Sequence, residues 1–266
     1  MAETTTQTYR VDEDLQLSWA GVTDTGRRRE VNQDAFLARF PLFVVADGMG
    51  GHAGGEIASS STVARLDAVV EAGDVSTGAI EQALVLAVQD IMGHPDTTDE
   101  GTGTTLTGVF LDDGDEGRRW IVLNIGDSRV YLQRGDRLSQ ITTDHSVVQE
   151  LIAQGKLSPE EAEGHPYSNV ITRAVGASEL RAPDYVAVDV HQGDRFVICS
   201  DGLTKELTDY GILHFLREHS DPAEAVEAML AAALENDGRD NITIVVLQVD
   251  AVAERDSSSP SDESAA

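Results

Sequence analysis

The chain of 266 residues has a single cysteine, Cys199, so a disulfide within the chain is excluded. Cys199 lies in the apolar run R-F-V-I-C-S, where we expect a small core residue rather than a reactive thiol. No uninterrupted apolar stretch approaches the ~18 residues that a membrane span needs. The start, M-A-E-T-T-T-Q-T, has neither the basic nor the apolar region of a signal peptide. These absences predict a cytoplasmic protein.

Basic residues are also scarce. The chain has 19 lysines and arginines against 47 acidic residues, a formal net charge of −28. Nucleic acids and anionic membranes are bound by basic patches, so we expect neither as a partner. The charge is typical of a soluble acidic protein, but it also leaves open that some of the acids cluster to hold cations. The hydrophobic content of 41% is enough for a sizeable core.

The two ends of the chain differ in composition from its middle. Residues 1–14 are polar and show no apolar period, and residues 252–266 are rich in Ser, Asp and Glu, so we expect two disordered tails. No Pro- or Gly-rich linker and no internal repeat divides the rest. We therefore predict one domain over 15–251.

Short runs rich in Val, Ile, Leu and Phe, bounded by turn residues, predict ten strands. They cover 15–22, 35–40, 42–46, 104–111, 120–125, 129–133, 138–141, 185–190, 195–199 and 242–249. Helical periodicity covers 56–71, 78–92, 209–219 and 222–235. Strands in succession with helices in pairs predict an α+β fold, with antiparallel sheets and helices packed outside them.

An aspartate stands within two residues of a glycine at one end of four apolar runs: Asp47, Asp127, Asp201 and Asp240. One Asp-Gly pair is ordinarily a turn, but four at strand ends point to a shared site. Such carboxylates repel one another, so they converge only around a cation. Oxygen ligands favour Mg²⁺ or Mn²⁺, and two such ions sharing a carboxylate activate water for attack on phosphorus.

A dinucleotide site is the alternative for the glycine-rich turn, because residues 48–53 fit G-x-G-x-x-A between a strand and a helix. Asp67 even stands about 20 residues further on. Two observations oppose this reading. Asp67 falls in a helical pattern, and Asp47 would face the pyrophosphate without a compensating ion.

Motifs along the chain resemble the bacterial branch of the metal-dependent, type 2C (PPM) serine/threonine protein phosphatases. They are T-D-T-G-R-R-R-E-V-N-Q-D, V-A-D-G-M-G-G-H-A-G-G-E, G-T-T-L-T, I-G-D-S-R-V-Y, I-T-T-D-H-S, C-S-D-G-L-T and G-R-D-N-I-T. The resemblance implies a β-sandwich flanked by helices on both faces, in four α-β-β-α layers. It also implies a two-metal site at one end of the sandwich and hydrolysis of phosphoserine and phosphothreonine in proteins.

The resemblance also implies the metal ligands. Asp47 matches the carboxylate that bridges two Mn²⁺ or Mg²⁺ ions, and Gly48 the carbonyl ligand of the second ion. Asp201 and Asp240 match ligands of the first ion. Asp127, with Asp201 shared, resembles the ligand of a third, weaker ion.

Two further residues match catalytic groups of the family. Asp34 matches an acid that orients metal-bound water. Arg29 matches the arginine that binds the substrate phosphate, a role that suits a planar guanidinium, whereas we expect Arg27 and Arg28 to be solvated charges.

The chain departs from the family at two of its motif positions. Gln33 stands where some members carry a Glu ligand of the second metal. Met49 stands where some carry a histidine proposed as general acid, which leaves His52 or a water as the proton donor.

The segment 143–176 resembles the family's flap over the site, which tunes substrate choice. Helices are predicted over 147–154 and from 158 onward. We expect surface polar roles for His145 and His165.

The expected reaction is one in-line attack on phosphorus by a hydroxide shared by two Mn²⁺ or Mg²⁺ ions. The family implies phosphorylated proteins as substrates, among them a Hanks-type kinase and its targets, and we expect a monomer. Two alternatives stay open: an inactive phosphatase fold that senses or scaffolds, and a partner-switching phosphatase that acts on one anti-sigma-antagonist-type protein.

Overall fold

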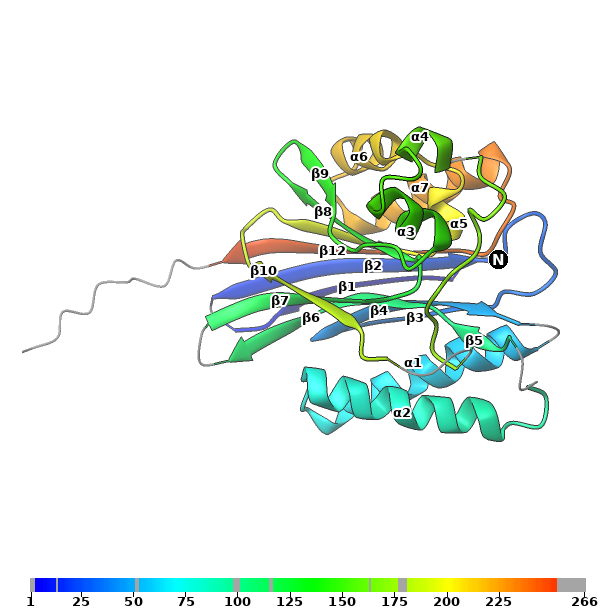
Figure 1. Cartoon of the computed structure of the whole chain (residues 1–266). Helices are drawn as coiled ribbons and strands as arrows, with labels where there is room; N and C mark the ends of the chain where they lie inside the picture. The colour runs from blue at the N-terminus through cyan, green and yellow to red at the C-terminus, as the bar shows by residue number, and fades with distance from the viewer. Residues whose placement is uncertain are drawn as a thin grey trace, which may run out of the picture.

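Two antiparallel sheets stack face to face between helices in the structure, a computed structural model that describes residues 3–12, 14–50, 53–97, 101–114, 117–162, 164–176 and 181–252 (Figure 1). The first sheet contains, in spatial order, β1 (Glu3–Arg10), β2 (Leu15–Asp24), β12 (Ile242–Val252), β11 (Arg195–Cys199), β8 (Arg129–Arg134) and β9 (Arg137–Gln140). The second contains β10 (Asp184–Asp189), β7 (Gly117–Ile125), β6 (Leu106–Gly114), β4 (Leu42–Met49) and β3 (Asp34–Arg39), with β5 (Gly103–Thr104) beside β4.

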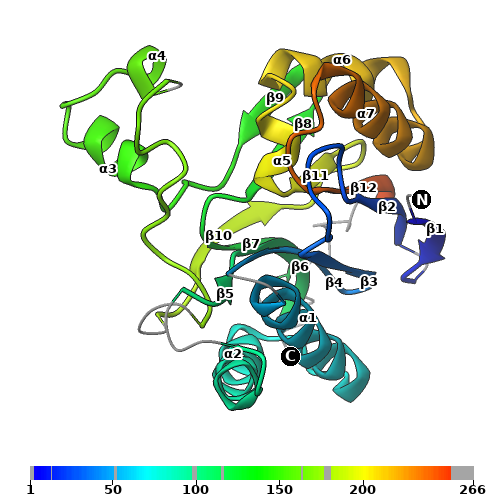
Figure 2. The same cartoon turned by 90° about the vertical axis from the view of Figure 1, so that its right-hand side faces the viewer.

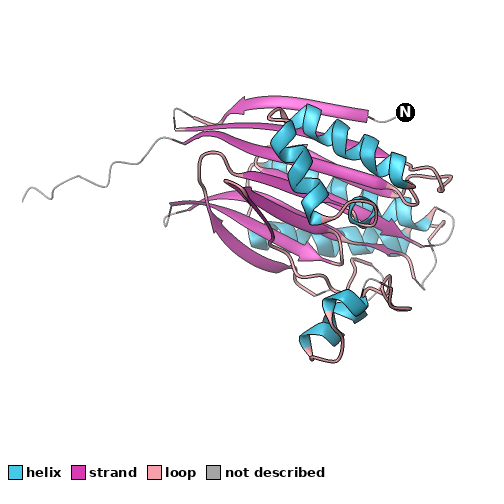
Figure 3. Ribbon diagram, turned by 90° about the horizontal axis from the view of Figure 1, so that it is seen from above, coloured by secondary structure: helices cyan, strands magenta, loops and turns pink. Residues whose placement is uncertain are grey.

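Helices cover both outer faces, which confirms the predicted α+β fold with α-β-β-α layers. On the second sheet lie α1 (Gly54–Ala72) and α2 (Thr77–Gly93), and on the first lie α6 (Asp209–Glu218) and α7 (Pro222–Asn236). Figure 3 looks onto the helices that cross the first sheet. None of the helices in the described ranges is long and apolar enough to cross a membrane.

The strands separate three hydrophobic cores because successive side chains point to opposite faces. In β11, Phe196 and Ile198 enter the core between the sheets, whereas Val197 and Cys199 pack under the helices. In strand β4 of the other sheet, Phe43 enters the core between the sheets, whereas Val44 packs under α1 and α2. The prediction of Cys199 as a core residue is confirmed, because it is fully buried.

The expectation of a disordered segment over 1–14 is wrong for Glu3–Arg10. These residues form the edge strand β1, which pairs with β2 from Glu3↔Thr23 to Arg10↔Gln16. The threonine-rich sequence has no apolar period, but β-branched threonine favours strands, and an edge strand needs no buried face. At its end the Tyr9 ring stacks on Phe40, 5.2 Å between centroids. At the other terminus, β12 continues to Val252, and the tail expected there otherwise lies outside the described residues.

The flap segment leaves the sandwich after β9. It carries α3 (Val147–Ala153) and α4 (Pro159–Ala162), which stand apart from the sheets and from α1 and α2 in Figure 2. A bridge between Thr104 and Val175 ties the end of the flap to the body, and a bridge between Ser146 and Ile171 joins the two sides of its base.

The core between the sheets yields a stability prediction. Trp120 is fully buried there and meets Phe196 edge to face, 5.6 Å between centroids. We expect Trp120→Ala to lower the free energy of unfolding by about 3–5 kcal/mol, because it leaves a cavity. Urea unfolding measures this, with Met92→Ala as the control, since Met92 is 69% exposed. The predicted packing is contradicted if the two variants are equally stable.

Candidate metal centre

Two of the predicted acids face each other across a strand pair. Asp34 begins β3, Asp47 lies near the end of β4, and the antiparallel register pairs these two residues directly. Side chains opposed in this way have Cβ atoms about 4.5–5.5 Å apart, and like charges there are destabilising. The sheet therefore holds two carboxylates close together, where a cation would offset their repulsion.

The other acids reach the same end of the sandwich from the first sheet and the turn beside it. Asp127 lies in the turn between β7 and β8. Asp201 begins the one-turn helix α5 (Asp201–Thr204) after β11, and Asp240 precedes β12. Because β11 pairs antiparallel with both β8 and β12, the end of β11 lies beside the starts of β8 and β12, and the three acids meet at this end of the strands.

The predicted site residues surround one cavity of about 1390 Å³. Six of the seven line it, namely Arg29, Asp47, Gly48, Asp127, Asp201 and Asp240. The seventh, Asp34, accepts a hydrogen bond at its Oδ2 from the Ser200 hydroxyl, 2.8 Å away. Flap residues such as Val148 and Asn169 also line the cavity.

Backbone contacts fix the turn that carries Asp47. The Asp47 amide donates to Thr105 Oγ1 at 3.0 Å, and the Thr105 amide donates back to the Asp47 carbonyl at 2.9 Å. Gly48 is tightly enclosed, because a Cβ there would collide with the carbonyl oxygens of Gly55 and Gln33. Only glycine fits this approach of the β4 turn to the start of α1.

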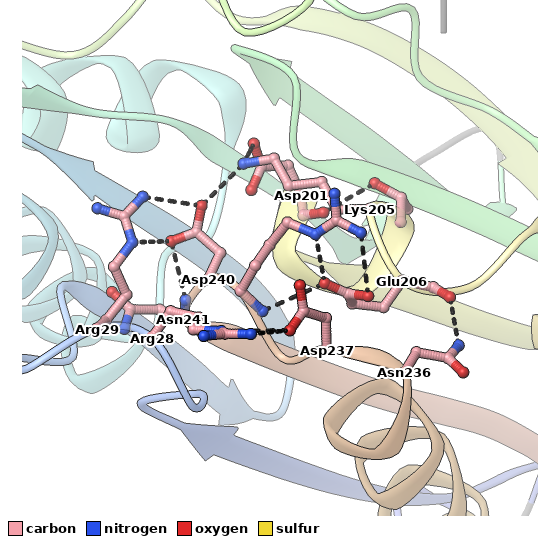
Figure 4. A network of polar contacts seen from close by, with 11 residues as sticks. Arg28, Arg29, Asp201, Lys205, Glu206, Asn236, Asp237, Asp240 and Asn241 are labelled. Atoms are coloured by element: carbon pink, nitrogen blue, oxygen red, sulfur yellow. Dashed lines mark hydrogen bonds and ion pairs between the residues drawn. The ribbon is translucent and has the colours of Figure 1, made fainter. Parts of the chain in front are cut away.

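Two cations contact Asp240 (Figure 4). Arg29 binds it with two nitrogens, Nε at 2.8 Å from Oδ1 and Nη2 at 3.0 Å from Oδ2. Lys205 Nζ lies 2.8 Å from the same Oδ2 and 2.5 Å from Oδ2 of Asp201. Arg28 turns away to Asp237 at 2.8 Å, and both Arg27 and Arg28 are exposed, as predicted.

The acids perturb one another strongly. Burial, with added repulsion from Asp201, raises the pKa of Asp34 to about 7 despite the Ser200 hydrogen bond. Burial and the Asp201 charge likewise raise the pKa of Asp127 to about 7. Burial and the surrounding carboxylates raise the pKa of Asp47 well above its ordinary value. These groups resist ionising together without a cation.

Neighbouring positive side chains lower the pKa of the other two acids against the effect of burial. Burial raises the pKa of Asp201, and Lys205 only partly offsets this. Burial would also raise the pKa of Asp240, but Lys205 and Arg29 together lower it. Asp240 is thus the carboxylate most readily ionised in the cluster.

The chemistry of the residues present fits a divalent metal, although in the described ranges no three His, Cys, Asp or Glu side chains are placed to hold one as they stand. Oδ1 of Asp34 and Oδ1 of Asp201 are buried without a hydrogen-bond partner among the described residues. Buried carboxylate oxygens without partners are costly unless an ion or water meets them. An all-oxygen set of this kind suits Mn²⁺ or Mg²⁺. The candidate ligands are the carboxylates of Asp47, Asp127, Asp201 and Asp240 with the Gly48 carbonyl.

Sequence reasoning missed the residues that position these acids. Ser200 holds Asp34, and its own Oγ accepts from the Thr243 amide at 3.0 Å. Asn241 spans the loop before β3: its Nδ2 donates to the carbonyls of Thr25 and Val31, and its Oδ1 accepts from the Gln33 amide. The only sequence signal for both is that each adjoins a predicted ligand.

Lys205 was also missed, although it stands four residues after Asp201, a spacing at which helical side chains meet. The expected surface role of His145 is wrong. Its Nδ1 accepts from the Gly126 amide at 3.0 Å and its Nε2 lies 3.1 Å from Asp184 Oδ2, so the buried ring supports the Asp127 turn. His165 lies on the flap beside Tyr167.

The positions that depart from the family pattern lie at the site. Met49 lines the cavity, as does Gln33, whereas His52 lies outside the described residues. Asp67 lies within α1 and pairs with Arg39 at 2.7 Å, which is incompatible with the ribose-binding acid of a dinucleotide site.

Comparisons with known proteins identify the family. The family described as protein phosphatase 2C matches residues 24–236. The serine/threonine protein phosphatase PstP of Mycobacterium tuberculosis is 37% identical over 251 residues, which cover 88% of this chain and 45% of PstP. Protein phosphatase PhpP of Streptococcus pneumoniae is 35% identical over 239 residues, covering 86% of this chain and 96% of PhpP.

One solved structure of a similar protein contains metal ions. The catalytic domain of PstP in complex with two manganese ions superposes with a TM-score of 0.77 at 35% identity, covering 88% of this chain and 98% of that one. The chain belongs to the protein phosphatase 2C family, whose members depend on Mn²⁺ or Mg²⁺. It spans about half the length of PstP.

The raised carboxylate pKa values predict how stability depends on pH without metal. Asp34 and Asp127 hold their protons up to about pH 7 when folded but lose them near 3.8 when unfolded. The folded state therefore binds more protons between these values, so the free energy of unfolding should fall as pH rises from 5 to 7.5. Urea unfolding in EDTA measures this slope.

Asp34→Asn should flatten that slope, whereas Asp136→Asn, at a fully exposed turn, should leave it unchanged. A metal-free protein that gains stability as pH rises across this window would contradict the assignment.

Proposed function

We propose that this chain hydrolyses phosphoserine and phosphothreonine in proteins at the acidic cavity. The observation that carries the proposal is the gathering of Asp47, Asp127, Asp201 and Asp240 with Arg29 around one cavity. When bound, two Mn²⁺ or Mg²⁺ ions would share a hydroxide for in-line attack on phosphorus and neutralise the phosphate oxygens. The remaining tasks fall to the chain's own groups.

The proposed ligands follow from the carboxylates and their neighbours. Asp47, held between two strands, would bridge both ions, and the Gly48 carbonyl would serve the second. Asp201 and Asp240 would hold the first ion, and Asp127 with Asp201 a third, weaker one.

Arg29 and Asp34 have complementary proposed roles. The guanidinium fork that binds both oxygens of Asp240 has the geometry for two oxygens of a phosphate. Asp34, fixed by Ser200, would orient the attacking water through its free oxygen. Water bonds to phosphorus as the bond to the serine or threonine oxygen breaks. Because Met49 has no proton to give, that oxygen would take its proton from a water or from His52.

We further propose a cytoplasmic monomer that acts on proteins phosphorylated by a Hanks-type kinase and binds neither nucleic acid nor membranes. The single cysteine and the net charge of −28 support this setting. The catalytic domain would run from β1 to the end of β12, wider than the 15–251 expected from the sequence. Its flap over 143–176 would select substrates, since flap residues line the cavity.

The first test compares hydrolysis of p-nitrophenyl phosphate and a phosphothreonine peptide with and without Mn²⁺. We expect turnover only with metal, and a loss of at least about 100-fold in Asp201→Asn, which removes a charged ligand. Asp136→Asn should keep full activity. Thiol alkylation should also leave activity intact, because Cys199 is buried and burial raises its pKa to about 12.

Turnover by the metal-free protein would refute this mechanism. A wild-type chain that binds Mn²⁺ yet cleaves neither substrate would instead be a binding protein or a phosphatase that acts on one particular protein.

Adjacent arginines offer a matched test of phosphate binding. Arg29→Ala should lower kcat/KM for the phosphopeptide by about 10–100-fold, the value of a charge-assisted contact of about 1.4–2.7 kcal/mol. Arg28→Ala should change it by less than about twofold, because Arg28 forms an exposed pair with Asp237. Equal losses in the two variants would assign the effect to general charge rather than to a phosphate contact.

A further inference from the structure

The Lys205 ammonium lies between two carboxylates that come from different parts of the chain. It contacts Oδ2 of Asp201 at 2.5 Å, one helical turn back along its own segment, and Oδ2 of Asp240 at 2.8 Å, 35 residues further on (Figure 4). The carboxylates are sheltered, with side chains 18% and 16% exposed, and Lys205 is 25% exposed. This contact is therefore part of the site rather than a solvated surface pair.

Asp201 and Asp240 are also the two carboxylates proposed to share the first metal. An ammonium and a divalent ion both need the oxygen atoms that face each other here, and two cations at this separation would repel strongly. Within the described ranges, no group of three or more His, Cys, Asp or Glu side chains is placed so that it could hold a metal ion. The ammonium takes the place of a cation in this arrangement.

The identity of the cation matters. The chain contains 19 basic residues, and only Lys156 and Lys205 are lysines. Arginine forms a rigid fork that holds a carboxylate through two bonds, as Arg29 does on Asp240. Lysine is a point charge on a flexible stem. Lys205 also lines the cavity, so its side chain has space into which it can withdraw.

We propose that Lys205 is an internal counter-ion that occupies the first-metal position between Asp201 and Asp240 and is displaced when metal binds. The proposal rests on the proposed metal ligands. It makes Lys205 a residue that sets metal affinity, because each binding event must break its two ion pairs.

The two lysines allow a direct observation in the wild-type protein. A chain labelled with [ε-¹³C]lysine gives two side-chain NMR signals, and Lys156→Met identifies the one from Lys205. We expect diamagnetic Mg²⁺ to shift the Lys205 signal in proportion to site occupancy, while the signal from Lys156, exposed on the flap, stays in place. Calorimetry on the same sample records Mg²⁺ binding independently.

The outcomes separate the two proposals. Binding of Mg²⁺ with a shifted Lys205 signal supports displacement. Binding with an unmoved Lys205 signal overturns the counter-ion role and leaves the phosphatase site intact. An absence of any Mg²⁺ or Mn²⁺ binding overturns the proposed ligands, and the counter-ion role with them.

A matched pair of variants measures the consequence for affinity. Lys205→Met should bind Mn²⁺ at least about tenfold more tightly by calorimetry, equivalent to about 1.4 kcal/mol. Its melting temperature in EDTA should fall, because the acids lose their counter-ion. Lys156→Met should change the affinity by less than about twofold. Unchanged or weaker Mn²⁺ binding by a folded Lys205→Met would overturn the proposal, and the NMR test decides if that variant does not fold.

Discussion

Repulsion between carboxylates is the constraint on which the arrangement of this site depends. The strand register places Asp34 opposite Asp47, and three further acids reach the same end of the sandwich. Burial removes the water that would screen them, so the pKa of Asp34 and of Asp127 rises to about 7. A fold can hold such a cluster only by supplying protons, positive side chains or metal ions. The described contacts show the second solution, through Arg29 and Lys205 on Asp240.

The sandwich can hold this cluster of carboxylates because the packing of its hydrophobic cores, and not the site, keeps the strands rigid. Each central strand sends alternate side chains into two cores, as Phe196 and Val197 do from β11. The ends of such strands can then carry unfavourable groups, since they are fixed by packing along the rest of their length. Polar supports act at the rim: Ser200 links Asp34 to β12, and Asn241 holds the loop that leads into β3. Local destabilisation at the site is thus offset by the body of the fold.

The sequence predicted the strands, the long helices and the acids because each is a local pattern. An aspartate after an apolar run is visible without knowing what lies opposite it. The supporting contacts are not local: Lys205 meets Asp240 across 35 residues, and Asn241 meets Thr25 across 216. His145 was misjudged for the same reason, because its partners Gly126 and Asp184 come from different strand ends. The first strand was missed because a threonine-rich edge strand lacks the alternation that marks a half-buried one.

Two side chains at the site, Gln33 and Lys205, act on its charge in the same direction. Gln33 replaces a carboxylate by a neutral amide, and Lys205 adds a positive charge against Asp201 and Asp240. Both make the cavity less negative, which weakens the Coulomb attraction for a divalent ion. These effects act together on Asp240, because its one carboxylate contacts both Arg29 and Lys205 and is also a proposed ligand of the first metal. An ion bound by the proposed ligands would have to compete there with both side chains.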